Sequence, residues 1–137
     1  MGIYDGTPDV KTSSNPAANT EASITVPAGN KWLILSARVS CALGATQTPL
    51  VSLVITDASD NVIASYAGSS AAMSASTTST FDWYEGAALT AGAGATSNRG
   101  PIPRGLVVRA GWKVATSTAG KGANTDLTAL SLHVIKQ

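Results

Sequence analysis

Few residues of the types that perform catalysis or bind metals occur in this chain. His133 is the only histidine and Cys41 the only cysteine, so one chain supplies neither a multi-histidine nor a multi-cysteine zinc site. A nucleophile–histidine–carboxylate triad would have to use His133, and no G-x-S-x-G sequence accompanies it. We therefore expect no catalytic residue, metal or cofactor. His133 is predicted on the more polar face of the last strand, and Cys41 as an inert buried thiol.

The eight acidic residues do not form a carboxylate pair suited to hydrolysis. A glycosidase needs two carboxyl groups that face each other about 5–9.5 Å apart. Asp82 and Glu85 are separated by an odd number of positions, which places them on opposite faces of a strand. Asp57 and Asp60 bracket a turn and lack the spacing of a calcium loop. These patterns favour turn chemistry over acid–base or metal chemistry.

Basic residues gather late in the chain. Arg99, Arg104, Arg109 and Lys113 occur close together, with Trp112 among them. Basic residues interleaved with aromatics could bind nucleic acid, but the net charge of the whole chain is only +1. We therefore expect no nucleic-acid partner. The three arginines are predicted to lie at one end of the fold and to contact an acidic partner surface.

The elements that must position these residues are predicted to be β-strands. Segments rich in β-branched and aromatic residues recur between turn signals, and no apolar i, i+3, i+4, i+7 pattern indicates a helix. In one of them the odd-numbered residues from Leu33 to Cys41 are predicted to face the core, with Ser36 and Arg38 opposite. The predicted strands span residues 22–26, 31–41, 50–57, 61–67, 77–85, 105–109, 112–117 and 127–136. Such a set predicts an all-β, antiparallel, jelly-roll-like β-sandwich.

A chain of 137 residues is expected to form one domain. Residues 1–20 carry many turn-forming residues and little periodicity, which predicts an N-terminal extended arm. Residues 21–137 are then a single β-sandwich domain. Two long loops are predicted, at 68–76 and 86–103, and the second is nearly uncharged up to its arginine.

The surface is predicted to be weakly charged. Charged residues make up 12% of the chain, about half the usual ~25%, so small polar residues must cover much of it. This composition is easier to understand if part of the surface is buried in an assembly, although a β protein without any partner would also fit. No charged and apolar leader opens the sequence and no run approaches the ~18 apolar residues of a membrane span. We expect cytoplasmic synthesis and no membrane partner.

Glycine-containing turns precede several predicted strands. The stretches "VPAGNKW" (26–32), "IPRGLVV" (102–108) and "VRAGWKV" (108–114) place glycine at the third turn position, where a type II turn needs positive φ. We expect these turns to carry the chain between strands or sheets. Trp32 and Trp112 follow closely and are predicted to plug the ends of the core.

This layout, with "ITVPAGNKWLIL" early, "PIPRGLVVRAGWKV" late and the closing "LTALSLHVIKQ", resembles the jelly-roll capsid decoration (cement) proteins of tailed bacteriophages. The resemblance implies a non-enzymatic virion protein, synthesised in the host cytoplasm, that sits on the capsid surface and clamps adjacent major capsid subunits. It also implies a homo-oligomer, a dimer or a trimer.

Six residues are candidate partner contacts, chosen from the arm, the second long loop and the basic stretch. They are Ile3, Tyr4, Leu89, Arg99, Arg104 and Arg109. The alternative function is a receptor- or glycan-binding module of a tail fibre or other virion component, in which Trp83, Tyr84 and Trp112 would form an exposed platform.

Overall fold

The structure, a computed structural model, describes residues 5–43, 49–90 and 96–137. Within these ranges the chain forms strands and turns without a helix, and the strands build two sheets. The predicted all-β sandwich is confirmed. The same ranges hold no helix long and apolar enough to cross a membrane.

The strands are short, apart from one that runs through the centre of the molecule. That strand is β3, Lys31–Ala42, and it pairs with four others. The remaining strands are β1 (Thr7–Thr12), β2 (Ser23–Thr25), β4 (Leu50–Thr56), β5 (Val62–Ala67), β6 (Thr78–Glu85), β7 (Ser97–Ile102), β8 (Val107–Arg109), β9 (Lys113–Ala119), β10 (Asp126–Leu127) and β11 (Ser131–Lys136).

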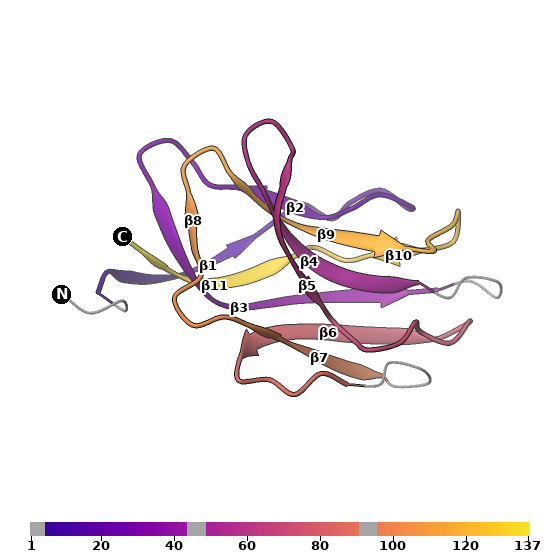
Figure 1. Ribbon diagram of the computed structural model, residues 1–137. Helices are drawn as coiled ribbons and strands as arrows, with labels where there is room; N and C mark the ends of the chain where they lie inside the picture. The colour runs from indigo at the N-terminus through magenta and orange to yellow at the C-terminus, as the bar shows by residue number, and fades with distance from the viewer. Residues whose placement is uncertain (1–4, 44–48, 91–95) are drawn as a thin grey trace.

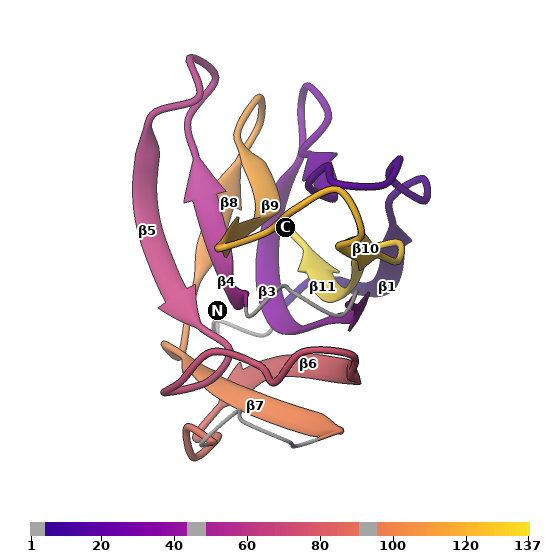
Figure 2. The same cartoon turned by 90° about the vertical axis from the view of Figure 1, so that its right-hand side faces the viewer.

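The two sheets differ in size. The larger has the order β1-β11-β3-β6-β7, with β8 and β10 also paired to β3, and the smaller has the order β2-β9-β4-β5 (Figure 1). Figure 2 shows β5, β4 and β9 on one side of the sandwich, and β3, β11 and β1 on the other. β6 and β7 lie below them, and the end of β5 approaches β7.

One strand pair departs from the predicted antiparallel arrangement. β6 and β7 run parallel, with Asp82 aligned to Arg99. Two antiparallel strands can be joined by a tight hairpin. Two parallel strands need a longer connection, because the chain must return to the end at which the first strand began. The long segment between Glu85 and Ser97 provides that return.

Two strands lie where none was predicted. β7 occupies the end of the predicted 86–103 loop, so that prediction is wrong for residues 97–102. β1 lies inside the predicted 1–20 arm, where it pairs with β11 over six residues. The boundary at residue 20 stays a prediction, but part of the arm is an edge strand of the larger sheet. The predicted 68–76 loop contains no strand, and its Met73 is buried in the core.

The core lies between the sheets and is aromatic at its centre. Phe81 and Trp83 are fully buried and their ring centroids are 6.1 Å apart. In β3 the predicted inward face is only half right. The register against β11 shifts between His133 and Val134, and Trp32 and Ile34, not Leu33, belong to the core cluster. A β-bulge adds one residue to one strand, which reverses the faces beyond it.

The glycine turns are as predicted at their third positions. Gly29, Gly105 and Gly111 have φ of 75°, 75° and 81°. Asn30 N–H donates to the Pro27 carbonyl at 3.1 Å, which closes the first of these turns. The aromatic plugs are confirmed for Trp32, which is buried, while Trp112 is partly buried against the core.

Candidate functional site

A shallow depression lies on the outer face of the larger sheet, away from the core. Its volume is about 540 Å³. Four strands supply its lining, two residues each from β3, β6 and β11 and one from β7. The lining residues are Ser36, Arg38, Asp82, Tyr84, Arg99, Ser131 and His133.

Strand register explains why these residues meet. Arg38 on β3 is aligned with Ser131 on β11 and with Asp82 on β6, and Asp82 is aligned with Arg99 on β7. Neighbouring strands are about 4.8 Å apart and aligned residues point to the same face. The four side chains therefore form one row across the sheet.

His133, Ser36 and Tyr84 form a second row beside the first. His133 is aligned with Ser36, and Ser36 with Tyr84. His133 is exposed, so its predicted place on the polar face of the last strand is confirmed.

Charge is unevenly balanced along the first row. Arg38 Nε–H donates to Asp82 Oδ1 at 2.6 Å and its Nη2 donates to Oδ2 at 3.1 Å. These hydrogen bonds and the carboxylate charge raise the pKa of Arg38 above its ordinary value. Within residues 5–43, 49–90 and 96–137, no hydrogen bond or ion pair reaches the Arg99 guanidinium. The first row thus ends in the Arg99 guanidinium, which has no negatively charged partner among the described residues.

The depression is equipped for contact and hydrogen bonding. No hydrogen bond in the described part of the chain joins His133 to Ser36, Ser131 or a carboxylate, and acyl transfer requires a base held against its nucleophile. No group of three or more His, Cys, Asp or Glu residues is placed to hold a metal ion in the described ranges. The site offers a planar guanidinium, a phenol, two hydroxyls and an imidazole to a partner.

The three arginines do not share one end of the sandwich, so that prediction is wrong. Arg99 is level with Arg38 of β3, whereas Arg109 is aligned with Lys31. Seven residues of strand separate these levels, which corresponds to roughly 20 Å. Arg104 lies in the exposed turn between β7 and β8. The Arg109 guanidinium carbon is 5.7 Å from the centroid of the Trp112 ring.

Leu89 is brought close to the depression by its neighbour in the chain. Thr90 N–H donates to the Arg99 carbonyl at 3.1 Å, and Arg99 N–H donates to Thr90 Oγ1 at 3.0 Å. Leu89 itself is 45% exposed. An exposed apolar side chain, and a cation without a partner in the described part of the chain, therefore lie on neighbouring segments. The other apolar candidates, Ile3 and Tyr4, lie outside the described residues.

The aromatic platform of the alternative function is not assembled. Trp83 is fully buried and its Nε1–H donates to the Tyr66 carbonyl at 3.0 Å. Tyr84, the next residue, lines the depression on the opposite face, because successive residues of a strand point to opposite sides. Trp112 is partly buried and belongs to the other sheet's side of the core.

Sequence reasoning missed most of this site. The sequence predicts Ser36, Arg38 and His133 only as residues on the polar faces of two strands, because alternation shows which residues share a face. It does not show which strands are neighbours. The pairing of Arg38 with Asp82, 44 positions away, has no local signal.

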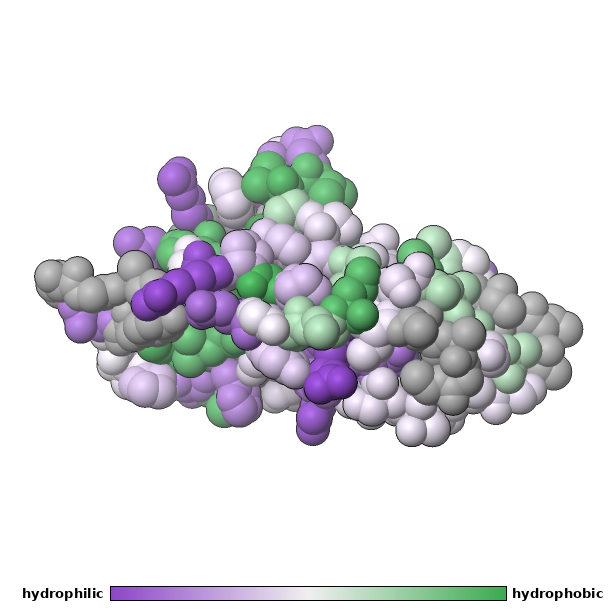
Figure 3. All heavy atoms as spheres, turned by 60° about the horizontal axis from the view of Figure 1, so that its bottom comes forward, coloured by the Kyte–Doolittle hydropathy of each residue, from purple (hydrophilic) through white to green (hydrophobic). Residues whose placement is uncertain are grey.

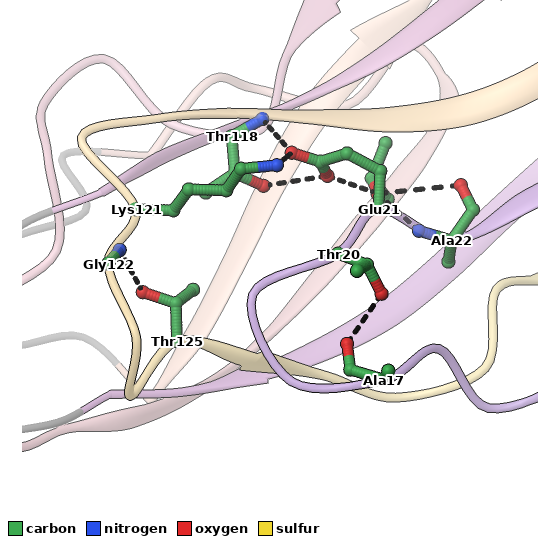
Figure 4. Close-up of polar contacts among 9 residues, drawn as sticks. Ala17, Thr20, Glu21, Ala22, Thr118, Lys121, Gly122 and Thr125 are labelled. Carbon is green, nitrogen blue, oxygen red and sulfur yellow. Dashed lines mark hydrogen bonds and ion pairs between the residues drawn. The ribbon is translucent and has the colours of Figure 1, made fainter.

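A second polar cluster surrounds Glu21 and serves the fold. Its carboxylate accepts from Thr116 Oγ1 at 2.6 Å, from Thr118 N–H at 2.9 Å and from Lys121 Nζ at 2.8 Å (Figure 4). Burial would raise the pKa of Glu21, but these bonds outweigh it and hold the pKa below its ordinary value. Ala22 N–H also donates to Thr116 Oγ1 at 3.0 Å. The cluster ties the segment before β2 to β9.

Comparisons with known proteins gave only distant structural similarity. No family model matches the chain, and no curated protein does. A solved structure of infectious bursal disease virus, Gx strain, is 8% identical with a TM-score of 0.36, over 98% of this chain and 31% of that one. A structure of the T13 viral particle of the same virus is 13% identical with a TM-score of 0.39, over 93% of this chain and 31% of that one. A structure of the Gt strain is 12% identical with a TM-score of 0.33, over 94% of this chain and 32% of that one.

The chain thus spans about a third of the length of these viral proteins. TM-scores below 0.5 carry no argument about function, so what the protein does must be argued from its own surfaces.

Proposed function

We propose that this chain is a structural virion protein that binds the outside of a phage capsid and stabilises contacts between major capsid subunits. The observation that supports it most is the outer face of the larger sheet, where the depression ends in Arg99, whose guanidinium has no hydrogen bond or ion pair among the described residues. A cation at such a position is suited to an acidic protein surface. The role needs no catalysis and no cofactor.

The composition of the surface supports the same role. With 12% charged residues, the protein has little charge to keep it soluble as an isolated monomer. Four large hydrophobic residues of the described ranges are exposed. They are Val10, Val62, Ile63 and Leu89. Burial of such residues between copies, or against a shell, removes them from water.

The proposed mechanism is mechanical. A stable contact needs about 1,000 Å² or more of buried surface, and a homo-oligomer, dimer or trimer, that engages several capsid subunits gains avidity. Leu89 and Arg99 form the proposed contact with an acidic and partly apolar capsid surface. Four further residues remain proposed contacts: Arg104 in the turn between β7 and β8, Arg109 at the other level of β3, and Ile3 and Tyr4. Nucleic acid and membranes are not partners in this proposal.

Co-sedimentation with undecorated expanded heads of the parent virus tests this function. Saturable binding is expected, weakened about tenfold by Arg99→Glu, because charge reversal places like charge against an acidic partner. Arg109→Glu tests the second proposed contact, at the other level of β3, separately in the same assay. Loss of binding with Arg109→Glu alone would move the contact to that level. Absence of saturable binding by the unaltered protein would exclude the proposed function.

A receptor- or glycan-binding role is the second candidate, favoured by one observation. Tyr84 lines the depression beside the Arg38–Asp82 ion pair, and an aromatic ring with neighbouring polar groups is suited to a sugar. Screening immobilised glycans with the unaltered protein and with Tyr84→Ala tests it. Glycan binding lost in Tyr84→Ala, together with no head binding, would favour this candidate.

A further inference from the structure

Among the described residues, six strands pair on one side only, and five of them carry features that prevent pairing with another chain. Unpaired backbone at a sheet edge is a template for a further strand, and proteins block it with short strands, charges or proline. β1 contains Pro8, Asp9 and Lys11, and β7 contains Arg99 and Pro101. β2 and β8 are only three residues long, and β10 only two.

The sixth edge strand, β5, has none of these features. It is six residues long, VIASYA, and contains neither a charged residue nor proline. It lies at the end of the smaller sheet, where Figure 2 shows it at the margin of the molecule. Val62 and Ile63 at its start are 63% and 51% exposed. Figure 3 shows hydrophobic residues gathered where the β4–β5 hairpin projects from the body.

Only the first part of this edge is open. At its far end Trp83 Nε1–H donates to the Tyr66 carbonyl. Gly100 packs so closely on Ala67 that an added Cβ would lie 1.9 Å from the Ala67 oxygen. The open segment is therefore Val62–Ser65. A register shift in the β4–β5 pair leaves Ile63 as the extra residue, which explains why two successive apolar side chains are both exposed.

The open segment is held in place by the turn that precedes it. Asp57 Oδ1 accepts from Ser59 N–H at 2.8 Å and from Asn61 N–H at 2.9 Å. Lys113 on β9 forms an ion pair with Asp60 in the same turn. A strand fixed in this way loses little further conformational freedom when a partner strand is added.

We propose that the open segment of β5 pairs antiparallel with the same segment of a second copy across a two-fold axis. The segment carries no charge, so the same segment of a second copy is not repelled from it. A charged strand of another protein would have no opposite charge on this segment to pair with. Because the other five edges are blocked, pairing closes at two chains and cannot continue into a filament. Val62 and Ile63 of both chains are then removed from water. This inference deepens the self-association in the proposed function and rests on it.

Sedimentation velocity on the full chain tests this inference. The unaltered protein is expected to sediment with twice the 13.8 kDa chain mass. Val62→Lys and Ile63→Lys are each expected to weaken the dimer at least about tenfold. Val10→Lys is the matched control, because Val10 is 55% exposed on the blocked edge β1, and it should leave the dimer unchanged. Thermal unfolding of each variant checks that the lysines have not destabilised the fold.

Two results would overturn the β5 dimer. One is a monomer for the unaltered chain at about 100 μM, a concentration at which a specific dimer is populated. The other is dissociation by Val10→Lys as complete as that by Ile63→Lys. Head binding separates the two proposals. A monomeric protein that still binds heads overturns only the β5 dimer, whereas a dimer that ignores heads overturns only the capsid function.

Discussion

At the scale of single residues, Glu21 shows how one carboxylate joins distant segments. Its hydrogen bonds to Thr116, Thr118 and Lys121 fix the chain before β2 onto β9. We predict that Glu21→Gln lowers the free energy of unfolding by about 1–3 kcal/mol at neutral pH, because buried donors lose a charged acceptor. Urea unfolding measures this. An unchanged free energy of unfolding would mean that the cluster is incidental.

The same residue gives a pH dependence of defined sign. The pKa of Glu21 is lowered in the folded protein, and hydrogen bonds from Lys11 and Lys136 lower that of Asp9 to about 2. A carboxyl group whose pKa is lower in the folded state than in the unfolded state stabilises the fold at pH values above its unfolded pKa. This stabilisation is lost as the pH falls through the folded pKa. We predict a falling free energy of unfolding from about pH 5 down towards pH 2, and a smaller fall in Glu21→Gln. Equal pH profiles would contradict the assignment.

Cys41 illustrates a residue whose chemistry is suppressed by its surroundings. It is fully buried, and burial, with smaller contributions from Glu21 and Asp126, raises its pKa to about 11. The thiolate is the reactive form, so a thiol reagent at neutral pH is predicted to label the folded protein very slowly. Labelling of the protein unfolded in denaturant measures the total amount of reactive thiol. Fast labelling of the folded protein would show that the core opens at β3.

At the scale of elements, β1 is the strand whose role the sequence left undefined. It pairs with β11, Asp9 forms an ion pair with Lys136, and Gly6 lies against Ile135. We predict that deletion of residues 1–20 leaves a folded sandwich, since β11 keeps its pairing with β3. The melting temperature should fall by at least about 5 °C, and head binding should weaken.

Deletion of residues 1–6 is the control for that truncation, because it spares β1. Circular dichroism and thermal unfolding report on both variants. If the chain without residues 1–20 is unfolded, β1 is an indispensable part of the domain and the boundary at residue 20 is wrong.

Strands could be predicted from the sequence where buried positions hold apolar residues or where buried and exposed positions alternate. β6 and β9 alternate in burial along their length, and β3, β4 and β11 are rich in buried apolar residues. β7 alternates equally well, but its inward residues are Asn98, Gly100 and Ile102, two of which carry no apolar signal. β1 has no fully buried residue, so its pairing depends on backbone bonds to β11 that the local sequence does not reveal.

At the scale of the whole molecule, the tryptophans report on where the core lies. Trp32 and Trp83 are buried and Trp112 is partly buried. We predict blue-shifted tryptophan emission that a soluble quencher reduces only weakly, and no change on addition of sugars. Strong quenching, or a sugar-dependent change, would contradict this core and would support the glycan-binding alternative.

The sequence by itself determined the all-β class, the glycine turns and the buried Cys41, because alternation, turn geometry and apolar burial are properties of neighbouring residues. Tertiary structure decided which strands are neighbours, and pairing and register join positions far apart in the chain. That pairing places Arg38, Asp82 and Arg99 in one row and leaves β5 at an open edge. One bulge was enough to exchange the faces of Leu33 and Trp32, since a strand has a period of two residues.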